Sequence, residues 1–179
     1  MKTICALCFL GCLWMPFAVY ADDGASVEYK IKAGYLYNFT KFITWSADDT
    51  ETFNVCIVGS DPFGDLIDPI EQRTVAGRAI KLLRLEDFRG VDENGPHCHI
   101  LFVSATLNNK LAANKGLSNT LVVGDKDDFI ERGGMIGFVT KQGKIKLQIN
   151  LDNIKQGGLR ISAKLLEVAD SVMGESHDQ

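Results

Sequence analysis

FNVCIVG, residues 53–59, decides the fold, because it is a nearly continuous apolar run that ends at a glycine. Strands buried on both faces of a parallel sheet have unbroken apolar runs of this kind. CHILFVS at 98–104 has the same character, and residues 79–85 and 120–124 are further strand candidates. Because helical candidates separate these runs, the pattern predicts βαβ units and a parallel core.

Amphipathic helices are expected around the strands. An apolar stripe at three-to-four spacing runs from Val27 to Phe42 and predicts a helix that ends near Trp45. Further helices are expected over residues 61–70, 107–116 and 158–173.

The end of the chain adds a hairpin. Residues 135–140 and 144–150 alternate in hydropathy around Lys141-Gln142-Gly143, which is typical of an antiparallel hairpin. Right-handed crossovers between parallel strands place helices on both faces of the sheet. The expected fold is α/β, a three-layer α/β/α arrangement with a central mixed, mostly parallel sheet and a C-terminal antiparallel hairpin.

The first 21 residues have the composition of a secretory signal peptide. Residues 4–19 are apolar and uncharged, and Val19-Tyr20-Ala21 fits a cleavage site. We therefore expect residues 1–21 to be a signal peptide, residues 22–179 to be one domain, and the mature protein to be periplasmic. A membrane anchor is an alternative, although the run is short against the ~20 residues that a span needs. A lipoprotein acylated at Cys12 is another.

Export would leave Cys56 and Cys98 as the two remaining cysteines. An even count in an oxidising compartment predicts one disulfide between them, with two buried free thiols as the alternative. Closing a loop of about 43 residues would stabilise the fold by roughly 4 kcal/mol in the chain-entropy model.

The charge and the motifs exclude several kinds of function. The net charge of −4 and the scattered basic residues argue against a nucleic-acid partner. Ser60 and Ser104 follow strands, as nucleophiles often do, but neither lies in a nucleophile motif. His97 and His99 should point the same way from a strand, yet a tetrahedral metal site needs more ligands. No catalytic residue, metal ligand or cofactor site is therefore assigned.

Binding remains the best interpretation of the other candidates. Tyr37 and Trp45 lie off the main helical stripe, so they are candidates for partner contacts. Ser60 follows a central strand, and Arg160 could hold an anionic ligand or a partner carboxylate. A small-ligand-binding sensor that uses the loops around Ser60, Ser104 and Asp125 is the alternative function, and a serine hydrolase is a third.

An ordered set of segments resembles the YfiR family of periplasmic proteins. The segments are YKIKAGYLYNFTKFITW from Tyr29, FNVCIVGSDPFG from Phe53, CHILFVS from Cys98, GGMIGFV from Gly133, KIKLQIN from Lys144 and GLRISAKLLEVA from Gly158.

The resemblance implies a non-enzymatic negative regulator. It would bind the periplasmic sensor domain of an inner-membrane diguanylate cyclase, repress cyclic di-GMP signalling and so limit biofilm formation. An outer-membrane lipoprotein that sequesters the repressor is a further implied partner, and a homodimer is left open. Cys56 and Cys98 match one of two disulfides in the family, and the second pair has no counterpart here.

Overall fold

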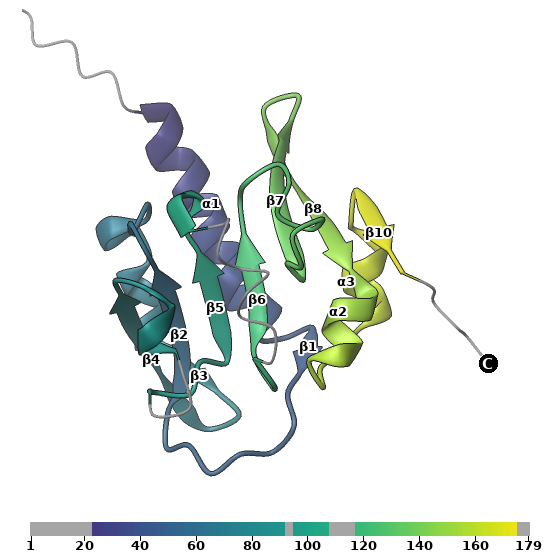
Figure 1. Cartoon of the computed structure of the whole chain (residues 1–179). Helices are drawn as coiled ribbons and strands as arrows, with labels where there is room; N and C mark the ends of the chain where they lie inside the picture. The colour runs from purple at the N-terminus through teal and green to yellow at the C-terminus, as the bar shows by residue number, and fades with distance from the viewer. Residues whose placement is uncertain (1–22, 92–94, 108–116, 175–179) are drawn as a thin grey trace, which may run out of the picture.

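The computed structural model describes residues 23–91, 95–107 and 117–174, and an eight-stranded sheet forms its centre. The strand order is β10-β8-β7-β6-β5-β2-β4-β3 (Figure 1). In chain order these strands are β2 (Phe53–Val58), β3 (Thr74–Val75), β4 (Arg78–Leu85), β5 (Ile100–Val103), β6 (Leu121–Gly124), β7 (Ile136–Lys141), β8 (Lys144–Asn150) and β10 (Ser171–Met173). A separate two-stranded antiparallel sheet joins β1 (Ile43–Thr44) to β9 (Arg160–Ile161).

The pairing confirms the predicted α/β class. β4, β2, β5, β6 and β7 run parallel in that spatial order, and β8 returns antiparallel to β7 through the predicted hairpin. All residues of β2, β5 and β6 are buried, which agrees with their unbroken apolar sequences.

Helical segments cover the sheet. The longest described helix, α1 (Asp23–Phe39), passes behind the sheet in Figure 1. Its Tyr29 ring contacts Phe63, the residue just before η1 (Gly64–Leu66). β4 and β5 lie on opposite sides of β2, so the connection from β4 to β5 runs across the sheet in the opposite direction to the connection from β2 to β4. Because such crossovers are right-handed, η3 (Phe88–Gly90) is expected on the other face of the sheet. Further helical segments among the described residues are η2 (Asp68–Gln72), α2 (Leu151–Gln156) and α3 (Ala163–Glu167).

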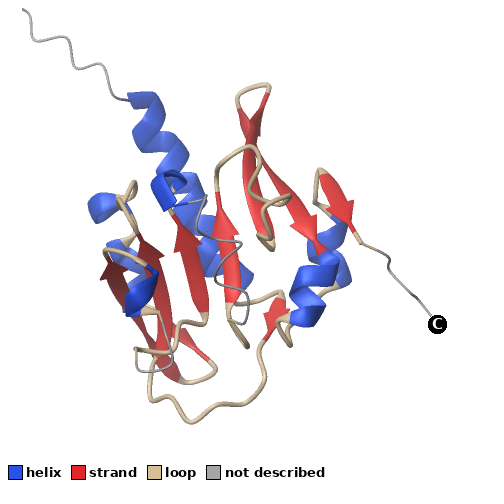
Figure 2. Cartoon of the chain, viewed as in Figure 1, coloured by secondary structure: helices blue, strands red, loops and turns tan. Residues whose placement is uncertain are grey.

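Three predicted helices differ in the structure. The first ends at Phe39 rather than near Trp45, because the chain turns and enters β1. The helix over residues 61–70 is replaced by two 3₁₀ segments, η1 and η2. The continuous helix over residues 158–173 is wrong: Figure 2 shows strands on either side of the short α3.

Two predictions lie outside the described residues, namely the helix over residues 107–116, apart from its first residue, and the signal peptide over residues 1–21. Within the described ranges, no helix combines the length and the hydropathy that crossing a bilayer requires.

Candidate functional site

The predicted disulfide joins β2 to the segment just before β5, so only one of its cysteines lies in a strand. Cys56 lies in β2 and Cys98 lies two residues before β5, with their Cα atoms 5.8 Å apart. Both residues are buried. Because β2 and β5 are hydrogen-bonded neighbours, their spacing falls in the range that a disulfide spans.

Ser60 and Ser104 mark the edge of the sheet where ligands of α/β proteins usually bind. β2 leads to β4 on one side and β5 leads to β6 on the other, so their carboxyl ends form a topological switch point. A Cβ atom built on Gly59 would lie 3.0 Å from Cβ of Ser104 and 3.1 Å from Cγ of Leu107. The described side chains therefore pack closely where a ligand would enter.

The described histidines do not reach these serines. His97 and His99 precede β5, whereas Ser104 follows it, and β5 separates the two ends by about 13 Å. His177 lies outside the described residues. Within the described part of the chain, no serine–histidine pair of a hydrolase is assembled at the carboxyl edge.

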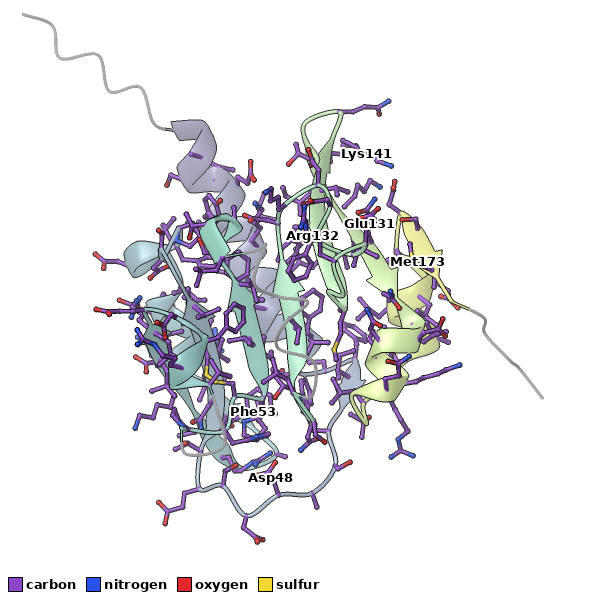
Figure 3. The ribbon with its side chains drawn as sticks, viewed as in Figure 1. Asp48, Phe53, Glu131, Arg132, Lys141 and Met173 are labelled. Carbon is purple, nitrogen blue, oxygen red and sulfur yellow. A yellow bond between two sulfur atoms is a disulfide. The ribbon has the colours of Figure 1, made fainter. Side chains whose placement is uncertain are left out.

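The opposite edge of the sheet carries a compact polar cluster around His99, which we call the His99 cluster. It consists of His99, Asp48, Thr50 and Arg78, and Figure 3 labels Asp48 at this end of the molecule. The Nη1 atom of Arg78 donates to Oδ1 of Asp48 at 2.8 Å and to the hydroxyl of Thr50 at 2.9 Å. Thr50 also hydrogen-bonds to Asp48. The cluster thus joins the loop after β1 to the first residue of β4.

The bonds of His99 fix its protonation. The backbone N–H of Asn54 donates to Nδ1 at 3.0 Å, so the lone pair of Nδ1 is used as an acceptor. The proton of the neutral ring is then on Nε2, which donates to Oδ2 of Asp48 at 3.0 Å. Burial lowers the pKa of His99, although the bond to Asp48 opposes this shift. The imidazole is therefore neutral near pH 7.

Asp48 is the anion of the cluster. Burial disfavours its charged form, but hydrogen bonds from Thr50 and His99 outweigh that effect and hold the pKa of Asp48 well below its usual range. Nη1 of Arg78 lies 2.8 Å from Oδ1 of Asp48, so the negative charge of the carboxylate is neutralised by the guanidinium beside a neutral imidazole.

His97 brings a third possible metal ligand to this edge. Donor atoms of Asp48, His97 and His99 lie within 4.8 Å of one another, and the two imidazole rings are 4.9 Å apart, although both histidines precede β5 and do not lie in a strand. A metal on Nε2 of His99 would need the ring proton on Nδ1, opposite the N–H of Asn54. Arg78 also lies 3.2 Å from Nε2. These groups suit a hydrogen-bonded cluster better than a metal site.

Trp45 is attached to the His99 cluster rather than exposed as a free anchor. Its Nε1 donates to the backbone carbonyl of His99 at 2.8 Å, and its ring meets Phe53 edge-on at 5.0 Å. Arg160 lies nearby in the small sheet, because it pairs with Thr44. The Arg160 side chain is exposed.

Tyr37 and Ser60 lie elsewhere. The ring of Tyr37 is half-buried on α1, with the ammonium group of Lys41 4.7 Å from its centre. Ser60 is exposed beyond the carboxyl end of β2, whereas Trp45 contacts Phe53 at the start of that strand. The structure therefore does not bring the four predicted binding residues into one site.

A second buried polar group was missed by sequence reasoning. Lys32 of α1 has a side chain only 4% exposed, and its Nζ lies 2.8 Å from Oδ2 of Asp125 and 2.6 Å from Oε1 of Glu28. The hydroxyl of Tyr29 donates to the same Asp125 oxygen at 2.9 Å. Burial and then the Asp125 charge raise the pKa of Tyr29. The spacing of Glu28 and Lys32 was the one local signal for this group.

Asp125 is buried although it belongs to an acidic stretch of the sequence. The acidic residues from Asp125 to Glu131 have the pattern of a solvated loop, but the side chain of Asp125 is 7% exposed. Two donors from α1 satisfy its carboxylate. Asp125 therefore fastens α1 to the carboxyl end of β6 and is occupied by protein groups.

Among the described residues, the exposed large apolar side chains fall into two groups along the sequence. Val27 and Ile31 lie one turn apart on α1, at 56% and 45% exposure. Val168, Val172 and Met173 lie in or just before β10, at 63%, 42% and 48% exposure. Because β10 ends the sheet, the second group lies at a strand edge. Exposed apolar groups of this kind are typical of contact surfaces.

Of two solved structures that resemble the chain, the first supports the same type of fold. An ABC domain from Streptococcus pneumoniae, solved in complex with L-Trp, superposes with a TM-score of 0.51 at 12% identity, covering 79% of this chain and 60% of that one. A conserved domain protein from Vibrio cholerae gives 0.49 at 12% identity, covering 80% and 60%. The chain thus spans 60% of the length of either structure. A search of curated proteins found no significant match.

These observations define an α/β domain with a mixed sheet and a disulfide that joins β2 to the segment before β5. The model of the YfiR/HmsC-like family matches residues 29–170. The chain therefore belongs to the YfiR/HmsC-like family, a family of periplasmic regulators of cyclic di-GMP signalling.

Proposed function

We propose that this protein is a periplasmic negative regulator that binds the periplasmic sensor domain of an inner-membrane diguanylate cyclase and lowers cyclic di-GMP production. The observation that carries the proposal is the family match, which spans residues 29–170. Regulation by contact also agrees with the separation of Ser60 and Ser104 from the described histidines. An outer-membrane lipoprotein that sequesters the regulator is part of the same proposal.

The β10 edge is the contact surface that this proposal favours. Val172 and Met173 are exposed on a terminal strand whose outer edge has no strand partner among the described residues. Free backbone groups at a sheet edge can pair with a strand of another protein, and neighbouring apolar side chains add buried area. Figure 3 labels Met173 beside this C-terminal strand.

Deletion of the gene tests the regulatory role. Cellular cyclic di-GMP is measured in the wild type, the deletion strain and a strain complemented in trans. The proposal expects a rise on deletion and a return to the wild-type level on complementation. An unchanged level in the deletion strain, where the wild-type strain demonstrably makes the protein, would contradict it.

Paired variants test the surface. Val172→Asp should leave cyclic di-GMP as high as in the deletion strain, whereas Val27→Asp, at a similarly exposed valine on α1, should complement fully. Immunoblots confirm that both variants accumulate. Full complementation by Val172→Asp would reject the β10 surface and leave the regulatory proposal intact.

A further inference from the structure

The β7–β8 hairpin is a basic segment in a chain of net negative charge. Residues 133–151 include Lys141, Lys144 and Lys146 but no Asp or Glu, although the whole chain has a net charge of −4. Lys141 forms an ion pair with Asp170. Lys144 and Lys146 are exposed, and neither has an ion-pair partner among the described residues. These two lysines therefore leave uncompensated positive charge on the hairpin.

The lysines lie on one face of the hairpin. Side chains alternate between the two faces of a strand, so Lys144 and Lys146 of β8 point the same way. Lys141 of β7 is paired with Lys144 and shares that face. On the opposite face of β8, Leu147 and Ile149 are buried. The lysines thus mark the solvent face of the hairpin, and the buried residues mark its core face.

The terminal strand β10 extends both of these faces. It runs parallel to β8, with Val172 paired to Ile149 and Met173 paired to Asn150. Because paired residues of neighbouring strands share a face, Val172 lies on the core face and Met173 on the lysine face. A strand added outside β10 would therefore contact Val172 with one set of alternate side chains, and its other set would lie on the lysine face.

The lysine charges act over the distance to such a strand. Neighbouring strands lie about 4.8 Å apart, so a strand added outside β10 would be about 10 Å from β8. This separation is close to the Debye length of about 10 Å at 0.1 M salt. Asp170, beside the start of β10, is neutralised by Lys141. Asp152 lies at the other end, where a Cβ atom built on Gly174 would be 2.8 Å from its Cγ. Acidic partner side chains are therefore favoured at the hairpin end of β10.

We propose that the partner segment that pairs with β10 is an alternating strand, with acidic side chains on the face of Lys144 and Lys146 and apolar side chains on the face of Val172. This inference rests on the proposed function, because it specifies the chemistry of the same β10 contact. A second copy of this chain fits the edge less well, since its own β10, residues 171–173, carries no acidic side chain. Charge complementarity of this kind mainly accelerates association and selects the partner.

Association kinetics test the inference with purified proteins. The probe is the periplasmic domain of a diguanylate cyclase from the same cell, with binding followed by surface plasmon resonance. The double variant Lys144→Glu with Lys146→Glu should associate about tenfold more slowly than the wild type in about 50 mM salt. The difference should fall below about twofold in about 500 mM salt, because salt screens the charges.

Matched variants separate the position of the charges from their sum. The control Lys30→Glu with Lys81→Glu changes the net charge equally, at exposed lysines of α1 and β4, and should associate within about twofold of the wild-type rate. A milder pair, Lys144→Gln with Lys146→Gln, removes the charges without reversing them and should slow association about threefold. Thermal unfolding of each variant confirms that it is folded.

The outcomes distinguish this inference from the proposed function. Wild-type binding that the hairpin variants and the control slow equally, or that none of them slows, would overturn the acidic partner strand and leave the regulatory role intact. Absence of wild-type binding to every such domain of the cell would overturn both. Sedimentation velocity covers the remaining occupant, because a wild-type dimer that Val172→Asp dissociates would place a second copy on β10 and overturn the inference.

Discussion

Lys32 is a buried charged residue of α1, and its ion pair with Asp125 attaches this helix to the end of β6. Its ammonium group is enclosed by Asp125, Glu28 and the ring of Tyr29, whose centre lies 4.4 Å from Nζ. Removing one member of a buried ion pair leaves the other charge desolvated without a partner. We expect Lys32→Met to lower the free energy of unfolding by about 3 kcal/mol in urea denaturation.

Matched variants separate charge from packing at this position. Lys30→Met changes an exposed lysine of the same helix and should alter the stability by less than about 0.5 kcal/mol. The double variant Lys32→Met with Asp125→Asn should recover part of the loss, because no unpaired carboxylate remains. Equal losses for Lys30→Met and Lys32→Met would show that the buried pair contributes nothing specific.

Gly134 is a position where the structure forbids a side chain. A Cβ atom there would lie 2.2 Å from Cε1 of Phe129 and 2.8 Å from its carbonyl oxygen. We expect Gly134→Ala to destabilise the protein by about 1–3 kcal/mol through overpacking. Gly34→Ala is the control, since nothing lies within 4 Å of its Cβ position in α1, and it should stabilise by about 0.5–1 kcal/mol. Thermal unfolding of both variants measures the difference.

Some residue contacts follow from sequence and others cannot. The pairing of Cys56 with Cys98 was predictable, because counting the exported cysteines leaves one combination. Lys32 and Asp125 are 93 residues apart, and nothing local to either residue marks the other as its partner. The His99 cluster is similar, since Asp48 and Arg78 reach His99 from different elements.

At the scale of elements, the hydropathy pattern predicts a strand correctly where the burial of its two faces follows a simple rule. The runs at 53–59 and 98–104 were predicted as strands because both faces are buried, and the 141–143 turn was predicted from alternation around it. Residues 158–173 have a helical apolar pattern, yet Ile161 pairs with Ile43 and Val172 pairs with Ile149. Tertiary strand pairing overrides local periodicity there.

The Cys56–Cys98 disulfide is a covalent link between β2 and the segment before β5. Replacing Cys56 and Cys98 together by Ala should lower the free energy of unfolding by roughly 2–4 kcal/mol, because the unfolded chain regains the entropy of a closed loop. Urea unfolding of the wild type with and without reductant checks this value. The stability of the double variant should not change with reductant. If reductant destabilised this variant too, the loss of stability seen in the wild type would not be due to the disulfide.

At the scale of the whole molecule, the four candidate binding residues do not lie together in one site. Trp45 and Ser60 are both near β2 in the chain, but a strand of six residues separates them, at about 20 Å. The sequence identifies which residues are apolar or charged, but not which of them share a surface. The family, by contrast, was predictable, since an ordered series of segments does not depend on surface geometry.

Binding between purified proteins tests the central claim most directly. Isothermal titration calorimetry is carried out with this protein and the periplasmic domain of an inner-membrane diguanylate cyclase from the same cell, with the Val172→Asp and Val27→Asp variants alongside. The account predicts saturable binding that Val172→Asp weakens at least tenfold, by about 1.4 kcal/mol, and Val27→Asp leaves unchanged. Absence of binding to every such domain of that cell, with all proteins folded, would contradict it.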